Sequence, residues 1–430
     1  MKVLLISENR SSHLLSPFPL GLAFLSAALR RAGHEVAVLD FMFLDAWQER
    51  LRSALEEMRP DTVGLSIRNI DNQNMHDPVF FLDDHRAIVN AIRAFSDAPV
   101  ILGGAGFGIH PAGCLRYLEA DFGIYGEGEE AFPLLLDAMK KGGFEGVPGA
   151  VRRTGDRIVV NPPGFITDPD RWVSPAYDDF DIKAYHEAKT ELPGCITVQS
   201  KRGCHMKCIY CSTPFLEGRQ CRWRDPGLTV GEMAALKREK DVRRFYVVDN
   251  VFNFPPSQAK DFCRRIIAEG LDVSWQAIVN PAFGDGELFR LMGRAGCRFI
   301  SLGNESGHEL VLKSLRKGFT LRNVKKAAGL ARSNGIRFAC FLLLGGPGET
   351  RETVMQSIEF MDELSPDLVM LKAGIRIYPG TELERIARRE GMIADDDDLL
   401  RPSFYLSPAV RDWVRDYLDV TVRDRGNWKI

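Results

Sequence analysis

The chain of 430 residues is 45% hydrophobic and 27% charged, and its formal net charge is −2. These values are typical of a globular protein with two or three domains, each with its own core. Acidic and basic residues are spread along the whole length, and no basic run would follow a phosphate backbone. We therefore expect a small-molecule or lipid-like substrate and no nucleic acid.

No apolar stretch approaches the ~18 residues that a membrane span requires. The N-terminal run MKVLLIS is short and leads directly into polar residues, which favours a first strand over a signal peptide. We expect a cytoplasmic protein.

Short β-rich runs alternate with helical patterns in the first third of the chain. Strands are expected at residues 3–7, 35–40, 62–67, 99–104 and 121–126, and helices at 20–33, 46–58 and 84–95. This alternation predicts a parallel sheet with right-handed crossovers, a doubly wound, Rossmann-like domain over residues 1–147.

Ligands of such sheets bind beyond the carboxyl ends of the strands. Glycine alone makes these ends look like tight turns, although glycine also lets backbone approach a large ligand closely. The expected strand ends carry Glu8, Asn9, Arg68, Asn69, Gly103, Gly104, Ala105, Gly126, Glu127 and Gly128.

A second βα series follows a linker at residues 148–194 that contains a hairpin and a Pro- and Asp-rich segment. Its strands are expected at 195–200, 243–249, 274–279, 297–303, 336–345 and 368–378. Six βα units predict a partial, TIM-type (β/α)6 barrel over residues 195–385. Residues 386–430 form a C-terminal extension, whose acidic run at 395–398 we interpret as solvated surface.

Three of the nine cysteines are clustered, whereas the other six lie in apolar or mixed surroundings and are interpreted as small buried hydrophobes. Cys204, Cys208 and Cys211 have the spacing C-x3-C-x2-C, and thiolates are the usual ligands of iron–sulfur clusters. Zinc normally takes four ligands, and His205 is badly placed to be the fourth because it directly follows Cys204. Three thiolates on a four-iron cluster leave one iron open to an amine and a carboxylate.

This spacing, in KRGCHMKCIYCS, resembles the hallmark of the radical S-adenosylmethionine (SAM) superfamily. Further segments are similar to that superfamily's SAM-binding motifs: Val248-Asp249-Asn250 in place of Gly-Gly-Glu, and the runs GNESG and GGPGET. Asn280 departs from the pattern, since relatives often have Arg there. The resemblance implies SAM contacts by Tyr210, Asp249, Asn250, Glu305, Ser306, Gly345, Gly346 and Pro347.

The same resemblance implies the cofactors and the chemistry. A 4Fe-4S cluster would open SAM reductively, and the 5′-deoxyadenosyl radical would remove a hydrogen from an unactivated carbon. An external electron donor of the flavodoxin or ferredoxin type is implied. The protein's own task would be to orient these groups and to exclude water.

The first domain resembles the cobalamin-binding subgroup of this superfamily in the runs SPFPLGLAFLSAALRRAGHEVAVLD, VGLSIRN, VILGGAGF and YGEGEEAF. The resemblance implies that cobalamin lies across the strand ends named above. The motif D-x-H-x-x-G is missing, and His13 is the only histidine in that region. We hypothesise that Arg68 lies under the cobalt and leaves it poorly ligated; an imidazole-ligated cobalt signal from His13 in an electron paramagnetic resonance spectrum would contradict this.

The expected function is methylation of an unactivated carbon. Cyclisation, ring rearrangement or carbon–carbon coupling without methyl transfer is the first alternative, and a non-catalytic cofactor carrier is the second. A tRNA methylthiotransferase is disfavoured, because Cys114 is alone in its domain and no basic module follows the barrel. The sequence does not identify the substrate.

Overall fold

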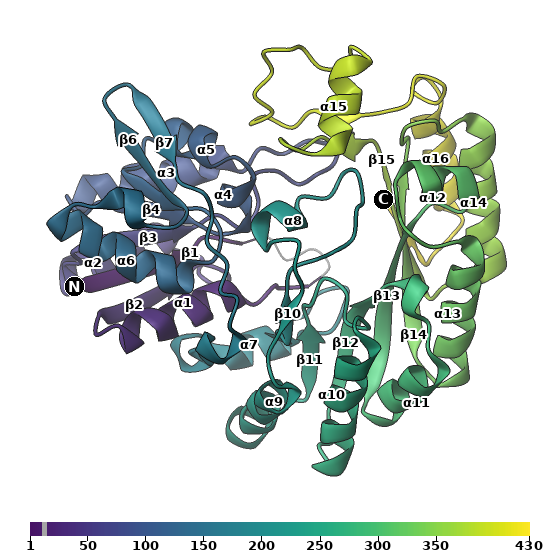
Figure 1. The fold of residues 1–430 in the computed structure, drawn as a ribbon, viewed down its shortest axis with the longest axis horizontal. Coiled ribbons are helices and arrows are strands. Elements are labelled where there is room, and N and C mark those ends of the chain that lie inside the picture. The colour runs from purple at the N-terminus through teal and green to yellow at the C-terminus, as the bar shows by residue number, and fades with distance from the viewer. Residues whose placement is uncertain (11–14) are drawn as a thin grey trace. The chain divides into compact units, whose positions relative to one another are not determined.

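The computed structural model describes residues 1–10 and 15–430, so His13 lies outside the described residues (Figure 1). The chain forms two compact units. One contains residues 1–72, 79–196 and 213–218, and the other contains 73–78, 197–212 and 219–430. The domain limits expected at residues 147, 194 and 385 stay predictions.

The first unit contains a seven-stranded sheet with the order β2-β1-β3-β4-β5-β6-β7. The strands β1 to β5 are parallel, as the alternation predicts, and the predicted hairpin adds β6 and β7 antiparallel at the edge. The bounds are β1 Lys2–Ser7, β2 Glu35–Asp40, β3 Thr62–Ser66, β4 Val100–Gly103, β5 Phe122–Ile124, β6 Ala150–Thr154 and β7 Arg157–Val160.

Helices cover this sheet, and residues 3–6 of β1 are at most 1% exposed. A central parallel strand needs such a continuous apolar run because both of its faces are buried. Three helices after β4 and β5 were not expected from the sequence: α4, α5 and α6. The helices are α1 Leu20–Arg31, α2 Trp47–Met58, α3 Leu82–Phe95, α4 Ala105–Ile109, α5 Pro111–Leu118, α6 Gly128–Lys141, α7 Ile182–Glu187 and α8 Thr213–Leu216.

The second unit is the predicted partial barrel, with the strand order β18-β15-β14-β13-β12-β11-β8. Side chains alternate along the strands, as in β12, where Trp275, Ala277 and Val279 are buried and the residues between them are half-buried. The bounds are β8 Ile196–Val198, β11 Arg244–Val247, β12 Ser274–Val279, β13 Cys297–Glu305, β14 Arg337–Leu344, β15 Leu368–Ala373 and β18 Trp428–Lys429.

The outer helices of this unit are α9 Pro226–Lys240, α10 Pro256–Ala268, α11 Gly286–Arg294, α12 Glu309–Ser314, α13 Leu321–Ser333 and α14 Arg351–Leu364. Two short antiparallel pairs accompany the barrel: β9 Lys201–Arg202 with β10 Arg222–Trp223, and β16 Ile375–Arg376 with β17 Phe404–Tyr405. Among the helices that the structure describes, none is long and apolar enough to span a bilayer.

The C-terminal extension is part of the barrel unit. It contains the second half of α15 Glu382–Arg389, and α16 Val414–Arg423, and its last strand, β18, pairs parallel with β15. The sequence did not predict β18, because a strand of two residues is too short to show a period.

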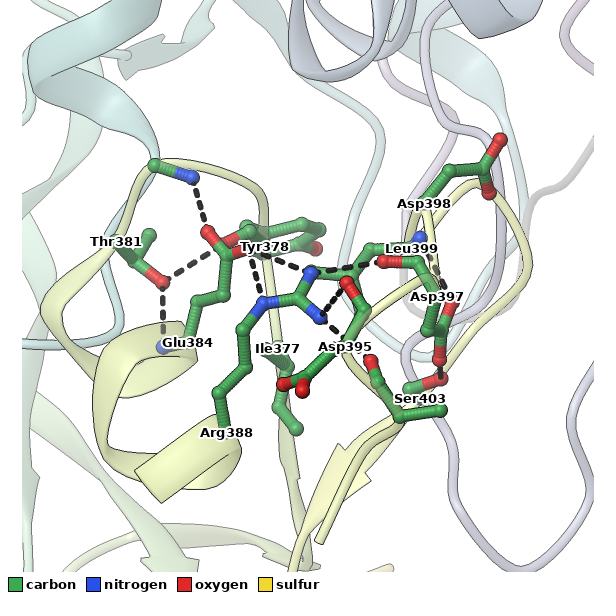
Figure 2. Close-up of polar contacts among 12 residues, drawn as sticks. Ile377, Tyr378, Thr381, Glu384, Arg388, Asp395, Asp397, Asp398, Leu399 and Ser403 are labelled. Atoms are coloured by element: carbon green, nitrogen blue, oxygen red, sulfur yellow. Dashed lines mark hydrogen bonds and ion pairs between the residues drawn. The ribbon is translucent and has the colours of Figure 1, made fainter. Parts of the chain in front are cut away.

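Arg388 of α15 organises the acidic run at residues 395–398 (Figure 2). Its guanidinium donates to the backbone carbonyls of Ala394 at 2.6 Å and Asp397 at 2.8 Å, and pairs with the carboxylate of Glu384 at 2.8 Å. The carboxylate of Asp397 in turn accepts from the amide of Leu399 at 2.8 Å. Three of the four aspartates are exposed, which agrees with a solvated surface, but the run is also a turn closed by one cation.

Replacing Arg388 by Met leaves several carbonyl oxygens without their charged donor. We expect a loss of about 2 kcal/mol in the free energy of unfolding, the usual cost of removing hydrogen bonds to a charged group. The matched control is Arg385→Met on the same helix, whose side chain is 68% exposed and pairs only with Glu382 in the structure as described. We expect that change to cost under about 0.5 kcal/mol. Equal melting temperatures for the two variants, measured at one scan rate, would contradict this role.

Candidate functional site

The three clustered cysteines lie together on one irregular segment, residues 203–212, between β9 and α8; we call it the cysteine loop. Cys204 is 8% exposed, and Cys208 and Cys211 are half-buried. Burial raises the pKa of the Cys204 thiol to about 11, and the nearby sulfurs of Cys211 and Cys208 add to the rise. Three crowded thiols of this kind suit positively charged iron, which would favour their thiolate forms.

The arrangement does not suit a single metal ion. Within residues 1–10 and 15–430, no three His, Cys, Asp or Glu side chains are grouped so that they could hold one ion. His205 turns away from a shared centre: its Nδ1 lies 3.4 Å from Sγ of Cys221, and its ring packs on Phe254 with 4.0 Å between centroids. Ligands to separate irons of a cluster need no common centre, so the donor set fits a cluster better than zinc.

Asp249, which follows β11, accepts hydrogen bonds from the two residues that lead into the cysteine loop. Its side chain is fully buried. One carboxylate oxygen accepts from the amides of Ser200 at 2.8 Å and Lys201 at 3.1 Å, and the other accepts from the Ser200 hydroxyl at 2.5 Å. Because the carboxylate is engaged within the protein, its role here is to position the loop, and a SAM contact by Asp249 stays a prediction. Asn250, next in sequence, is half-buried.

Within the loop, Tyr210 is anchored to Glu305 at the end of β13. The sequence predicted these two residues as separate SAM contacts. The Tyr210 hydroxyl donates to Oε1 of Glu305 at 3.0 Å. Glu305 ends β13 with a φ of +64°, a conformation that side chains other than glycine rarely adopt. Lys317 completes the group, with its Nζ 2.9 Å from the Tyr210 hydroxyl and 3.2 Å from Oε1 of Glu305.

The neighbouring segments differ in what they contact. Ser306 is buried and lies 3.1 Å from the hydroxyl of Ser357 in α14, so its side chain packs against a helix. Asn304 is fully buried, at 0% exposed. Neither its side-chain nitrogen nor its side-chain oxygen has a hydrogen-bond partner among the described residues. An unsatisfied buried amide in the GNESG run fits a site that accepts a polar ligand or water.

The GGPGET run forms a turn built around Glu349. One oxygen of its buried carboxylate accepts from the amides of Gly345 and Gly346, and within the described part of the chain the other oxygen has no partner. Gly345 has a φ of +90°, and a Cβ there would lie 2.2 Å from Leu406. Pro347 is half-buried beside these glycines.

Sequence reasoning did not identify Lys317 or Asn253, and it recognised the GGPGET run without naming Glu349 as a site residue. Asn253 is fully buried; its amide nitrogen donates to the carbonyl of Asn280 at 2.9 Å and its oxygen accepts from the amide of Asn280 at 2.9 Å. Asn280, where relatives often have Arg, is thus held through its backbone by Asn253 directly after β12. No local pattern singles out Lys317, Glu349 or Asn253, because the first lies in the mixed run LRKG, the second in a glycine-rich run and the third in a mixed segment, and the role of each depends on a partner distant in the fold or on a turn.

In the first unit, the predicted cobalamin residues follow parallel strands and so gather at one edge of the sheet. The order 2-1-3-4-5 places a topological switch point between β1 and β3, where ligands of such sheets bind. Glu8 follows β1, and its carboxylate lies 2.8 Å from Nε2 of His85. Burial lowers the pKa of His85, but the hydrogen bond and charge of Glu8 outweigh it, so the pKa is raised. Arg68, after β3, is exposed.

Glycines shape the ends of β4 and β5. At Gly103 a Cβ would meet nothing within 4 Å, whereas at Gly104, with a φ of +94°, it would lie 2.5 Å from the carbonyl of Ile67. The strand end is therefore open on one side and closely packed on the other, which fits the approach of a large ligand to the backbone. Glu127 accepts from the amide of Ile166 at 2.7 Å. Among the remaining predicted residues, Asn9 follows β1, Asn69 follows β3 and Gly126 follows β5, whereas Ala105 and Gly128 begin the helices α4 and α6.

Two family profiles match this sequence. The profile of the radical SAM superfamily matches residues 198–361, and that of the B12 binding domain matches residues 14–136. Tryptophan 2-C-methyltransferase of Streptomyces laurentii is 26% identical over 88% of this chain and 73% of its own. Hopanoid C-3 methylase of Methylococcus capsulatus is 28% identical over 85% of this chain and 67% of its own.

Other relatives differ in activity. Anaerobic magnesium-protoporphyrin IX monomethyl ester cyclase of Rubrivivax gelatinosus is 26% identical over 81% of this chain and 63% of its own. Among solved structures, the radical SAM methyltransferase TsrM from Kitasatospora setae, with cobalamin and a 4Fe-4S cluster bound, is similar with a TM-score of 0.82 and 25% identity. That match covers 95% of this chain and 84% of the other.

Replacing Cys204, Cys208 or Cys211 by Ala removes one expected cluster ligand. We expect each variant, reconstituted without oxygen, to lose most of its iron and labile sulfide in a chemical assay. Cys221→Ala is the matched control, because Cys221 lies next to the loop without belonging to the motif, and it should bind as much iron as the wild type. Zinc in place of iron in the wild type, or a loss of iron in the control, would contradict the assignment.

Glu349 makes stability depend on pH. Burial raises its pKa to about 7, despite the two amide hydrogen bonds that lower it. A carboxyl group whose folded pKa exceeds its unfolded value of ~4.3 stabilises the fold fully below that value, and this contribution is lost as the pH rises through about 7. We therefore expect the melting temperature of the wild type to fall relative to Glu349→Gln between about pH 5 and pH 8.

The exposed Glu352→Gln on α14 is the control and should leave the pH profile unchanged. If the difference between the wild type and Glu349→Gln did not vary with pH, the carboxyl group would not titrate in this range.

Proposed function

Because the chain belongs to the radical SAM superfamily and carries a B12-binding domain, we propose that it methylates an unactivated carbon of a small-molecule or lipid-like substrate. Its cofactors are a 4Fe-4S cluster, SAM and cobalamin. The supporting observation is that one chain combines a three-cysteine loop held by buried polar contacts with a doubly wound sheet whose strand ends are rich in glycine and open at Gly103.

The residues of the barrel unit hold and orient the reacting groups. When bound, the cluster would supply the electron that opens SAM, and cobalamin would supply the methyl group. Cys204, Cys208 and Cys211 would hold the cluster, while Tyr210 and Glu305 present a ring and a carboxylate beside it. An apolar core behind the loop excludes water; it contains Ile209, Val311, Leu315, Ile375, Ile377, Leu383, Ala387, Leu399 and Tyr405.

The residues of the first unit would bind cobalamin. Glycines at the ends of β4 and β5 admit the ligand to the backbone, and the buried His85 holds the Glu8 carboxylate in place. Arg68 would lie under the cobalt, where a guanidinium does not coordinate a metal because it has no free electron pair. We also expect an electron donor of the flavodoxin or ferredoxin type and a cytoplasmic location.

A second function, cyclisation or carbon–carbon coupling without methyl transfer, is supported by the similarity to a magnesium-protoporphyrin ester cyclase. The names of the relatives point to substrates as different as tryptophan and a hopanoid, so the proposed substrate class is broad.

The test is product analysis on the reconstituted holoenzyme. With SAM, a reductant and candidate substrates, we expect both 5′-deoxyadenosine and S-adenosylhomocysteine, and a labelled SAM methyl group in the product. Deoxyadenosine alone would favour cyclisation or coupling. If protein with verified cluster and cobalamin formed neither product, a cofactor carrier would be favoured and the proposal would be overturned. The Cys208→Ala variant gives the background.

A further inference from the structure

Lys317 is a cation buried inside the barrel unit. The residue is 6% exposed, and its Nζ contacts the Tyr210 hydroxyl at 2.9 Å and the Glu305 carboxylate at 3.2 Å. The ring of Tyr210 lies 5.5 Å and that of Phe319 5.7 Å from the ammonium group. A buried ammonium is costly unless such partners replace its water.

The segment that carries Lys317 packs along the cysteine loop. The amide of Ile209 donates to the carbonyl of Leu315 at 3.2 Å, and the amide of Leu383 donates to the carbonyl of Ile209 at 3.0 Å. Ile209 and Tyr210 are the two residues between Cys208 and Cys211. Lys317 therefore contacts the cysteine loop through the hydroxyl of Tyr210, a residue between two of the cluster cysteines in the sequence.

The charge of Lys317 persists in this place. Burial by itself lowers its pKa, but the charge of Glu305 and the sulfurs of Cys208 and Cys211 outweigh burial and raise it. The positive charge thus lies beside a residue of the cysteine loop, and the Glu305 carboxylate at 3.2 Å partly offsets it.

We propose that Lys317 positions the cysteine loop and raises the reduction potential of the cluster that the loop holds. A reduced cluster carries one more negative charge than an oxidised one, so a buried cation beside two of its thiolates stabilises the reduced form. Glu305 acts in the opposite direction. This inference rests on the proposed assignment of the cluster to Cys204, Cys208 and Cys211.

The experiment is a redox titration of the reconstituted protein, with the reduced cluster followed by electron paramagnetic resonance. The variants are Lys317→Met, which removes the cation, and Glu305→Gln, which removes the offsetting anion. Lys313→Met is the matched control, because Lys313 is exposed on the preceding helix α12. Tyr210→Phe removes the hydroxyl and keeps both charges. Iron and sulfide are measured first in every sample.

We expect Lys317→Met to shift the midpoint potential to more negative values and Glu305→Gln to more positive values, with Lys313→Met at the wild-type value. Opposite shifts would not arise from general loosening of the loop. Tyr210→Phe should change the potential less than either charge variant. If Lys317→Met does not retain a cluster, Glu305→Gln decides.

Unchanged potentials in the loaded charge variants, or shifts in the same direction, would overturn the role of Lys317. A wild-type protein that binds no iron and sulfide would instead overturn the cluster assignment, so the two failures are distinguishable.

Discussion

Holding the cysteine loop in one conformation is the constraint on which the barrel unit depends. Residues 203–212 have no helix or strand of their own, and three crowded thiols oppose their arrangement. Ordering each residue of such a segment costs about 1–2 kcal/mol of conformational entropy. The Asp249 carboxylate holds the residues that lead into the segment. Near its other end, Lys317 contacts Tyr210, and the backbone of Leu315 and Leu383 pairs with that of Ile209.

Buried ionisable side chains in this unit occur where they hold backbone amides or carbonyls in place. Asp249 accepts from the amides before the cysteine loop, Glu349 from those of the GGPGET turn, and Lys201 donates to the carbonyl of Phe252 at 2.7 Å. Apolar residues would make these positions easier to bury, but they could not orient loop amides and carbonyls. Their placement at the carboxyl ends of the barrel strands agrees with the location of chemistry in barrels of this type.

In the first unit, backbone conformation at the strand ends matters more than buried charge. At the sheet edge where the predicted cobalamin residues lie, Gly103 leaves space within 4 Å, whereas Gly104 is closely packed against the backbone of Ile67. The ion pair of Glu8 with His85 is the exception, because it buries an imidazole directly at the switch point of the sheet. This histidine lies on α3, far in sequence from the strand whose end it supports.

The sequence by itself determined both fold classes, since apolar runs and helical periods are local and survive without knowledge of partners. The spacing of Cys204, Cys208 and Cys211 was equally local, because three ligands on one short loop need no distant residue. Only the tertiary structure decided that β18 joins β15, that Ser306 turns toward α14, and that Asp249 is engaged with the loop.

The same holds for Lys317, which lies 107 residues from Tyr210 in the chain. In β13 the register shifts between Leu302 and Glu305, so a period of two does not predict which face each of these residues occupies. Side chains of this kind acquire their role from a partner that packing brings near, and no local pattern encodes that partner.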